Sequence, residues 1–511
     1  MMPPALGMHL LRRCKIAIIG TGFAGLGMAI RLQQNAEHDF QLFEREAGIG
    51  GTWYLNRYPG CACDVPSHLY SFSFAPNSQW SQLFAPREEI LAYLQGLWRD
   101  HGLAAKTQLN TEVNNLRWDE REQLWTFRDQ HGQAWAAQHV IAAMGGLSTP
   151  KPPDIPGLNS FTGRVMHTQL WDSQQDLRGQ RVAVIGTGAS AIQLVPQLQP
   201  LVAQLDIYQR TPAWIMPKPQ HQYSLEQRAL FERKPGRMRV VRGIIYSLME
   251  SRALAYNHLP VLLHLMEEKA LAHLHQQVSD PALRQRLTPD YRIGCKRVLL
   301  SNDFYPALSQ PNVQLLDQPI SSINSDGVID TLGQHRPVDT LILASGFDAG
   351  GVPPRGSIVG RNGQDLADAW QHGPQAYKGT LTSGFPNLFL LSGPNTGLGH
   401  NSVVYMIEAQ INYVLSALKT LQQTGMHSLE VKPEVEQAYN DRLQARLAKT
   451  VWQQGGCASW YKHPVSGRNV TLWPGFSWRF RRITREFDLA ACVLQPRSTP
   501  TQAARLQGQT A

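Results

Sequence analysis

Residues 15–25 read KIAIIGTGFAG, and residues 181–191 read RVAVIGTGASA. Each copy is an apolar run that ends in a glycine-rich turn of the form GxGxx(G/A), and each is followed by apolar residues at helical spacing. A continuous apolar run is typical of a parallel strand that is covered on both faces. The repeat therefore predicts an α/β fold built from two similar units, each of which begins with strand, turn and helix.

Glycine is required in such turns because the first glycine permits a tight turn and the second lets the backbone approach a pyrophosphate, which the following helix N-terminus attracts. Both units are therefore expected to be Rossmann-like dinucleotide-binding domains. At the first turn we expect contacts from Gly20, Gly22 and Gly25. At the second turn we expect contacts from Gly186, Thr187, Gly188, Ala189, Ser190, Ala191 and Gln193.

The residue 19 positions after the last fingerprint position distinguishes the two sites: it is Glu44 at the first and Arg210 at the second. A carboxylate accepts hydrogen bonds from a ribose 2′-hydroxyl, whereas a guanidinium attracts a 2′-phosphate. The first site is expected to take the adenosine of FAD or NAD. The second is expected to prefer NADPH to NADH, with a further hydroxyl contact from Thr211.

Composition excludes several other classes of protein. The chain has 511 residues, 42% of them hydrophobic and 17% charged, which excludes wholesale disorder and a small disulfide scaffold. Its net charge of +9 suits phosphorylated cofactors and would also suit nucleic acid, but no nucleic-acid-binding module accompanies it. We expect a cytoplasmic protein without a signal segment, a transmembrane span, a metal site or a nucleic-acid partner. Its oligomeric state stays open.

The cysteines are sparse. The six are Cys14, Cys61, Cys63, Cys295, Cys457 and Cys492. They lack the spacing of a zinc site or of a disulfide framework, so we expect reduced thiols. Cys61 and Cys63 follow a Gly-Gly-Thr segment but are too close in sequence for an unstrained bridge, which argues against dithiol redox chemistry.

Two longer motifs carry a resemblance to a known family. Residues 161–172, FTGRVMHTQLWD, match the pattern FxGxxxHxxxW(P/D), and residues 50–64 match (A/G)GxWxxxx(F/Y)P(G/M)xxxD. The chain resembles the type I Baeyer–Villiger monooxygenases, which are class B flavoprotein monooxygenases, over most of residues 15–488. The fingerprint residues, to which the resemblance gives a role in domain coupling, are Phe161, Gly163, His167, Trp171 and Asp172.

The resemblance implies an enzyme that uses FAD, NADPH and O2 to convert ketones into esters or lactones, through a C4a-peroxyflavin and a Criegee-type intermediate. Arg297, over the flavin, is the expected catalytic residue because a guanidinium keeps its charge and stabilises an anion. Asp64 is expected to orient it, and Lys296 to hold the NADP phosphate. The other implied FAD contacts are Gly51, Thr52, Trp53, Asp64, Tyr70 and Val113, and Trp460 is an implied NADP contact.

The expected organisation follows from these sites. We expect an FAD-binding domain in two parts (1–148 and 376–496), an NADP-binding domain in two parts (149–215 and 291–375), a helical insertion (216–290) and a disordered tail (497–511). Segments 142–146 and 344–348 are expected to cross between the domains.

Two alternatives stay open. One is a flavin monooxygenase that oxygenates nitrogen or sulfur, and the other is a non-catalytic NADPH/FAD redox sensor. Trp171, Asp172 and Arg297 favour the ketone-oxidising enzyme over the first alternative. The substrate-pocket residues near 395–404 are left unassigned, since GPNTGLGH departs from the GPGSP form of well-known ketone oxidisers.

Overall fold

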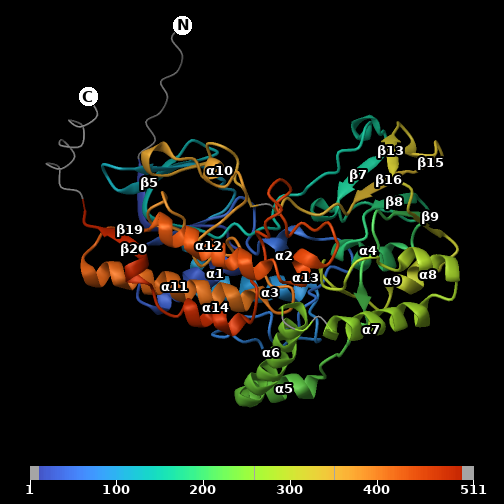
Figure 1. Cartoon of the computed structure of the whole chain (residues 1–511), viewed down its shortest axis with the longest axis horizontal. Helices are drawn as coiled ribbons and strands as arrows, with labels where there is room; N and C mark the ends of the chain where they lie inside the picture. Colours follow the sequence, from blue (N-terminus) through green and yellow to red (C-terminus); the bar gives the residue numbers. More distant parts are fainter. Residues whose placement is uncertain (1–10, 258, 260, 350, 498–511) are drawn as a thin grey trace, which may run out of the picture.

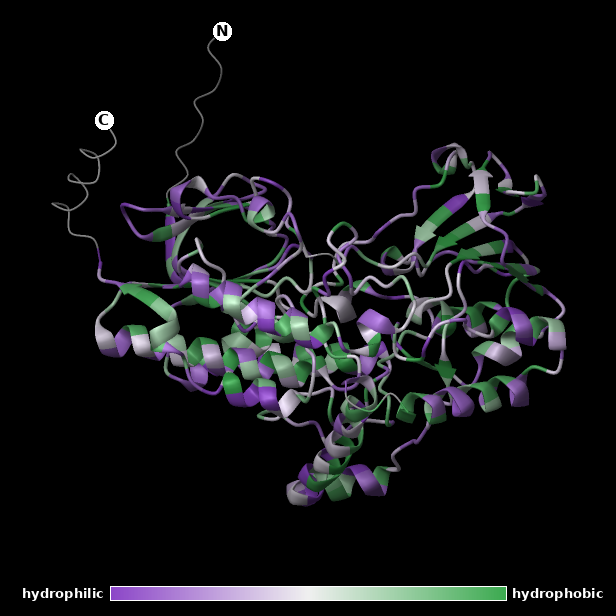
Figure 2. Ribbon diagram, viewed as in Figure 1, coloured by the Kyte–Doolittle hydropathy of each residue, from purple (hydrophilic) through white to green (hydrophobic). Residues whose placement is uncertain are grey.

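The computed structural model describes residues 11–257, 259, 261–349 and 351–497. Figure 1 shows two α/β lobes side by side, with a helical hairpin projecting beneath them. Each lobe is centred on its own sheet, and apolar residues make up most of the strands of the second sheet (Figure 2). The expected pair of Rossmann-like domains is confirmed in this arrangement.

The first lobe is built on an eight-stranded sheet of order β17-β4-β5-β6-β1-β2-β3, in which β18 also pairs with β6. Its strands are β1 (Arg12–Ile19), β2 (Phe40–Phe43), β3 (Thr107–Gln108), β4 (Val113–Asp119), β5 (Leu124–Asp129), β6 (Ala134–Ala142), β17 (Ile358–Val359) and β18 (Leu388–Leu390). Strands β1, β2 and β6 are parallel and fully apolar toward their carboxyl ends, which buries them between helices.

Helices from both ends of the chain cover this sheet. They are α1 (Phe23–Gln34), α2 (Thr52–Leu55), α3 (Arg87–Asp100), α10 (Leu366–Ala369), α11 (Val403–Thr424), α12 (Pro433–Leu447), α13 (Val451–Gln454) and α14 (Ser477–Ile483). A small ribbon of β19 (Ser428–Val431) and β20 (Cys492–Gln495) closes the C-terminal side. Helix α11 packs directly on α1, so the C-terminal part of the chain completes the domain that the N-terminal part begins.

The second lobe is built on a parallel sheet of order β12-β9-β8-β16-β7. Its strands are β7 (Arg164–His167), β8 (Arg181–Ile185), β9 (Gln204–Tyr208), β12 (Val313–Leu316) and β16 (Thr340–Leu343), flanked by α4 (Ala189–Leu198) and α9 (Phe304–Leu308). Smaller sheets join β10 (Ile215–Met216) to β11 (Leu299–Leu300), and β13 (Ile320–Ile323), β14 (Gly327–Asp330) and β15 (His335–Pro337) to one another.

Short 3-10 turns occur in several parts of the described chain. They are η1 (Leu103–Lys106), η2 (Leu158–Ser160), η3 (Thr168–Leu170), η4 (Arg361–Gly363) and η5 (Leu489–Ala491).

The segment between β10 and β11 is helical, as expected for 216–290. It contains α5 (Leu225–Arg233), α6 (Pro235–Asn257), α7 (Val261–Gln277) and α8 (Pro281–Leu287). Helix α5 begins with a capping box in which the Ser224 hydroxyl and the Gln227 side chain satisfy each other's backbone amides. Among the described residues, none of the helices is both long and apolar enough to cross a bilayer.

One expected boundary is wrong. Residues 291–375 were assigned to the NADP-binding domain, but β17 pairs with β4 in the first sheet. Ile358, Leu366 and Trp370 are buried in the same core cluster as Trp118. The chain therefore returns to the first lobe soon after β16 ends at Leu343, because this apolar segment covers that core. Of the expected tail, 498–511 lie outside the described residues.

Candidate active site

The first glycine turn is shaped to receive a phosphate. Gly20 has φ +101°, and a Cβ there would lie 2.5 Å from the carbonyl oxygen of Ala143, so only glycine fits. Gly22 caps α1, whose first amides donate no hydrogen bond to a capping side chain. Gly51 faces this turn, since a Cβ on Gly51 would lie 3.0 Å from the Cα of Gly22. These uncapped amides fit the pyrophosphate of FAD.

Glu44 lies beside this turn. Its Oε2 accepts hydrogen bonds from the Thr21 amide at 3.0 Å and from the Thr21 hydroxyl at 2.5 Å, and its Oε1 accepts one from the Glu46 amide at 3.0 Å. The amide of Thr111 donates to the Glu44 carbonyl at 2.7 Å, which brings the start of β4 at Val113 close to the same place. The carboxylate is thus buried and held beside the first turn, an arrangement that fits its predicted contact with an adenosine ribose.

The second turn repeats the geometry of the first. Gly186 has φ +112°, and a Cβ there would lie 2.6 Å from the carbonyl oxygen of Ala344. Gly188 caps α4, again without a capping side chain, and residues 189–191 form its first turn. The Thr187 hydroxyl donates to the Thr211 carbonyl at 3.4 Å, which joins the turn to the segment after β9. This arrangement fits a second pyrophosphate.

Arg210 and Lys296 form a cationic site beyond this turn. Arg210 is exposed just after β9, and Lys296 is half-buried, with its Nζ 4.8 Å from the ring centroid of Tyr291. Partial burial lowers the pKa of Lys296, and the charge of Arg210 lowers it further. Within the part of the chain that the structure describes, neither cation has an ion-pair partner. Asp290 lies close enough to oppose the lowering of the Lys296 pKa, but two neighbouring cations that form no ion pair within the described residues fit a 2′-phosphate.

Gln193, an expected cofactor contact on α4, forms side-chain hydrogen bonds with the first lobe. Its Oε1 accepts a hydrogen bond from the Tyr58 hydroxyl at 2.8 Å, and its Nε2 donates to the Ala62 carbonyl at 3.0 Å. A Cβ on Gly60 would lie 2.6 Å from the Gln193 carbonyl oxygen, so the two segments are in close contact. These hydrogen bonds show that Gln193 joins α4 to segment 58–62 of the first lobe.

Arg297 and Asp64 form the central pair of the site, although 233 positions separate them. Arg297 Nε donates to Asp64 Oδ2 and Arg297 Nη2 donates to Asp64 Oδ1, both at 2.6 Å. Desolvation opposes the ionisation of Asp64, but the charge and hydrogen bonds of Arg297 outweigh it and hold the pKa of Asp64 below its usual value. Asp64 in turn raises the pKa of Arg297. The guanidinium is therefore charged and fixed by a bidentate partner.

Aromatic side chains near the Arg297–Asp64 pair also contact the first residue of α1, just after the first glycine turn. Phe23, the first residue of α1, packs edge-on against Tyr70 with ring centroids 5.0 Å apart. The indole of Trp53 donates to the Tyr70 hydroxyl at 3.3 Å, and Thr52 begins the short helix α2 next to it. Tyr70 lies within electrostatic range of Arg297. The side chain of Arg297 is 36% exposed, so part of it is open to solvent or a ligand.

Glu267 on α7 holds the segment that carries Lys296 and Arg297. It accepts a hydrogen bond from the Ile293 amide at 3.0 Å and forms an ion pair with Arg292 at 2.9 Å. Sequence reasoning missed this residue, because Glu267 and Glu268 look alike as neighbouring acids on one helix. Burial distinguishes them: the side chain of Glu267 is 10% exposed, whereas that of Glu268 is 61% exposed.

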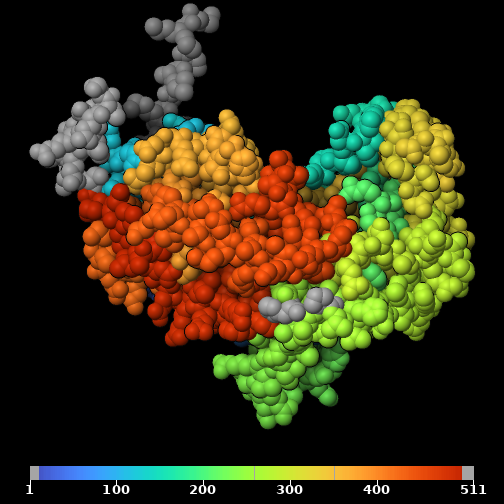
Figure 3. Space-filling model, in the orientation of Figure 1, coloured from blue at the N-terminus to red at the C-terminus, as the bar shows by residue number. Residues whose placement is uncertain are grey.

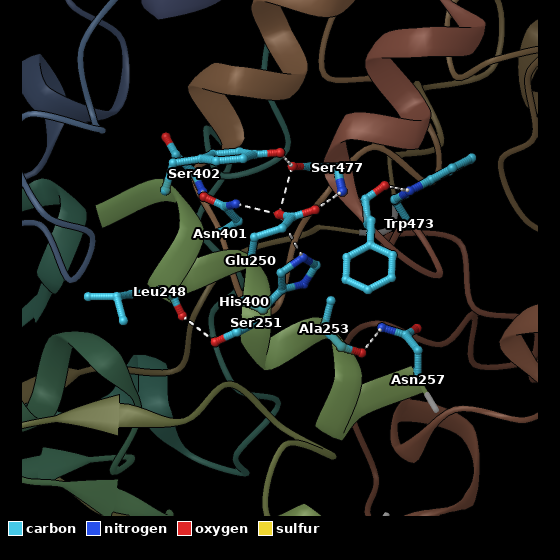
Figure 4. Close-up of polar contacts among 12 residues, drawn as sticks. Leu248, Glu250, Ser251, Ala253, Asn257, His400, Asn401, Ser402, Trp473 and Ser477 are labelled. Carbon is cyan, nitrogen blue, oxygen red and sulfur yellow. Dashed lines mark hydrogen bonds and ion pairs between the residues drawn. The ribbon is translucent and has the colours of Figure 1, made fainter. Parts of the chain in front are cut away.

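Glu250 on α6 is a second buried acid that sequence reasoning missed, and Figure 4 shows its surroundings. Its carboxylate accepts hydrogen bonds from Asn401 Nδ2 at 2.6 Å and from the amide and hydroxyl of Ser477 at 2.5 and 2.8 Å. His400 Nε2 lies 3.6 Å away. Glu250 thus joins the helical insertion to the loop before α11, the region left unassigned from sequence, and to the start of α14. The only sequence signal was an acid within an apolar helical stretch.

The fingerprint residues lie where the second sheet meets a crossing segment. His167 Nε2 donates to the Gly346 carbonyl at 3.1 Å, and the Gln169 amide donates to His167 Nδ1 at 3.1 Å. Burial lowers the pKa of His167, so the ring is neutral. Asp172 forms an ion pair with Arg164. The remaining fingerprint residues pack against other parts of the chain. Phe161 is buried beside the second sheet, and Gly163 lies against the Asp339 carbonyl. Trp171 packs against the largest cluster of buried apolar residues.

The expectation of six reduced thiols is wrong for one pair. Cys295 and Cys457 form a disulfide whose Cα atoms are 6.1 Å apart, with 162 positions between them. The other cysteines, Cys14, Cys61, Cys63 and Cys492, are free. The pair escaped detection because its spacing matches no local motif; the fold alone brings the two segments together. Trp460, three residues beyond Cys457, is 49% exposed at the edge of the site.

Comparisons with known proteins agree with this geometry. Residues 17–233 match the family model described as pyridine nucleotide-disulphide oxidoreductase. A Baeyer–Villiger monooxygenase of Pseudomonas aeruginosa is 54% identical over 96% of this chain and 93% of its own length. A solved cyclohexanone monooxygenase from Rhodococcus sp. Phi1 bound to NADP+ is 26% identical, with a TM-score of 0.85 over 95% of this chain and all of that one. A solved OTEMO complex with FAD and NADP is 26% identical, with a TM-score of 0.84 over 94% and 99% of the two chains.

Proposed function

Because the chain belongs to the Baeyer–Villiger monooxygenase family, and is an FAD- and NADPH-dependent enzyme that converts ketones to esters or lactones, we propose that Arg297 is its catalytic residue. The observation that supports this assignment is the bidentate pair of Arg297 and Asp64, in which the guanidinium is held by two hydrogen bonds and remains partly exposed. When bound, FAD supplies the redox chemistry that takes hydride from NADPH and activates O2. The fixed guanidinium stabilises the negative charge on the reacting oxygen, because it cannot release a proton at working pH.

The cofactors are held by the residues that surround their phosphates and riboses. The uncapped amides after Gly22 hold the FAD pyrophosphate, and Glu44 accepts hydrogen bonds from its ribose. The amides after Gly188 hold the NADPH pyrophosphate, while Arg210 and Lys296 bind its 2′-phosphate. Trp460 covers the NADP side from the neighbouring loop.

His167 acts in domain coupling rather than at the reacting atoms. Its hydrogen bond to the Gly346 carbonyl joins the end of β7 to the second crossing segment. We propose that this hydrogen bond moves with the crossing segment when the lobes change their relative position, which links domain movement to the geometry of the site.

We also propose a cytoplasmic location, which the four free cysteines support.

The assignment of ketone oxidation is tested with a panel of linear, cyclic and aryl ketones and one aryl sulfide. We expect ester or lactone from at least one ketone class, with NADPH consumed in step with product and little hydrogen peroxide released. Oxidation of the sulfide with every ketone untouched would indicate a heteroatom-oxygenating enzyme instead. A colourless protein, or a yellow one that NADPH does not bleach without oxygen, would indicate a sensor.

Asp64 is a positioning residue in this proposal, and Asp64→Asn tests it. The amide keeps the size of the side chain but removes the charge and one acceptor, so the guanidinium loses its fixed orientation. We expect ketone turnover to fall by about 10²-fold, with FAD content and anaerobic flavin reduction unchanged.

Asp339→Asn is the matched control, because Asp339 accepts similar hydrogen bonds from Arg181 at the surface of the second lobe. That variant should keep wild-type turnover. Equal losses in the two variants, or a loss of flavin reduction in Asp64→Asn, would show that Asp64 has only a general structural role.

A further inference from the structure

The disulfide joins two segments that meet at the edge of the site. Cys295 lies between α8 and β11 and is fully buried, whereas Cys457 follows α13 and is partly exposed. The Arg292 amide donates to the Gly455 carbonyl at 3.0 Å beside it. A Cβ on Gly455 would lie 2.6 Å from the Cβ of Cys295, so glycine permits this close approach. Besides the disulfide, the two segments share this hydrogen bond and a buried apolar cluster that contains Ile293, Cys295 and Tyr461.

The groups on either side of the disulfide belong to the site. Lys296 and Arg297 directly follow Cys295, and Trp460 and Tyr461 follow Cys457 within four residues. Tyr461 is buried in the same apolar cluster as Cys295 and lies within electrostatic range of Arg297. The disulfide therefore ties the segment that carries Lys296 and Arg297 to the loop that carries Trp460 and Tyr461.

The free cysteines are poorly suited to react with an oxidant. Desolvation raises the pKa of Cys61 to about 11 and those of Cys14 and Cys492 to about 12, and it raises that of Cys63 further. Their thiols are therefore protonated near neutral pH, and the thiolate is the reactive form. Cys457 differs from Cys61, Cys63 and Cys492 because it is partly exposed, and from all four because its partner sulfur lies next to it.

We propose that Cys295 and Cys457 form a reversible oxidation site for hydrogen peroxide, and that its oxidation restrains the loop that carries Trp460 and Tyr461. The Cys457 thiolate attacks one peroxide oxygen, breaks the O–O bond and forms a sulfenic acid with release of hydroxide. The Cys295 sulfur then displaces the sulfenic hydroxyl, and the thiol proton leaves with it as water. In sum, two thiols and one hydrogen peroxide give one disulfide and two waters. A dithiol reductant returns two electrons and restores both thiols.

Oxidation should slow the release of NADP+. The covalent bond fixes segment 292–297 and loop 455–461 at one point, whereas in the reduced pair only non-covalent contacts, the Arg292–Gly455 hydrogen bond and apolar packing, join them. Release of a dinucleotide held beneath a loop requires that the loop opens. The oxidised enzyme is therefore expected to release NADP+ and to turn over at least about threefold more slowly than the reduced enzyme. The oxidation step itself does not depend on the role proposed for Arg297.

The test uses two samples of the FAD-loaded full chain. Both are reduced with a dithiol and desalted, and one of them is then treated with hydrogen peroxide followed by catalase. Thiols counted after unfolding should fall from six to four, and peptide mapping should find Cys295 linked to Cys457. NADP+ release measured without ketone, and turnover with ketone, should both be slower in the oxidised sample. Cys457→Ser should behave like the reduced wild type under both treatments. Cys14→Ser, which replaces a free cysteine on strand β1 of the first sheet, should respond like the wild type.

Three results would overturn the proposal: six thiols that still titrate after peroxide, equal NADP+ release from the two wild-type samples, or a slowing of Cys457→Ser by peroxide. The comparison of the two wild-type samples needs no substitution, so it holds even where Cys457→Ser folds poorly. Because thiol count and NADP+ release are measured without ketone, failure here is distinct from a failure to oxidise ketones.

Discussion

Replacement of Arg297 by alanine is expected to abolish ester formation while NADPH still bleaches the flavin. The reason is that hydride transfer needs only that the two dinucleotides are bound, whereas the oxygen step needs a fixed cation at the reacting oxygen. Loss of one such stabilising donor costs about 10² to 10³-fold in turnover, and here a full charge is lost as well. The measurement is anaerobic flavin reduction in a stopped-flow instrument, followed by product analysis in air with hydrogen peroxide recorded alongside.

In the Arg297→Ala variant, NADPH that is still consumed in air should appear as hydrogen peroxide. Arg297→Lys should recover little ester, because an ammonium cannot make the two parallel hydrogen bonds to Asp64. Arg181→Ala, which breaks a similar pair at the surface, is the matched control and should keep full ester yield. A normal ester yield from Arg297→Ala would remove this residue from the catalytic role.

Replacement of Arg210 by alanine is expected to remove much of the enzyme's preference for NADPH over NADH. A hydrogen bond to a charged group contributes about 2 to 3 kcal/mol, so the KM for NADPH should rise roughly 30- to 150-fold. NADH carries no 2′-phosphate and should be little affected. The measurement is kcat/KM for both nucleotides at a saturating ketone concentration, repeated at high salt, where the wild-type preference should weaken.

Two variants make the Arg210 experiment specific. Arg210→Lys should keep part of the preference, since a point charge remains without the forked geometry. Arg178→Ala removes an exposed surface arginine and should leave both nucleotides unchanged. If Arg210→Ala raised KM equally for NADPH and NADH, the assignment of the 2′-phosphate to this residue would have to be withdrawn.

Much of the fold was predictable because its signals are local. The repeated strand and glycine turn predicted both sheets, and the equivalent positions of Glu44 and Arg210 predicted two sites of opposite charge. In the structure, Glu44 lies beside the first turn, and Arg210 lies near Lys296. The strands and turns could be predicted because each set occupies one short segment, whose geometry depends little on the rest of the chain, whereas the cofactor roles of Glu44 and Arg210 stay predictions.

The pairs that the fold brings together from distant segments were harder to predict. Asp64 was expected next to Arg297 only because both match motifs of a known family. The disulfide matched no motif, so nothing local pointed to it. Glu267 and Glu250 have no distinguishing pattern either, because burial of an acid is decided by the segments that pack on it. For the same reason, β17 was assigned to the wrong lobe.

The shape of the molecule gives a final consequence. Figure 3 shows the two lobes separated by a notch at the top of the view. The carbonyl oxygens of Ala143 and Ala344 lie against Gly20 and Gly186, and each of these alanines stands at the start of a chain segment that passes between the lobes. Each of these crossing segments, 142–146 and 344–348, therefore begins beside one of the two glycine turns. A dinucleotide bound at either turn would therefore lie next to the start of a segment that joins the lobes.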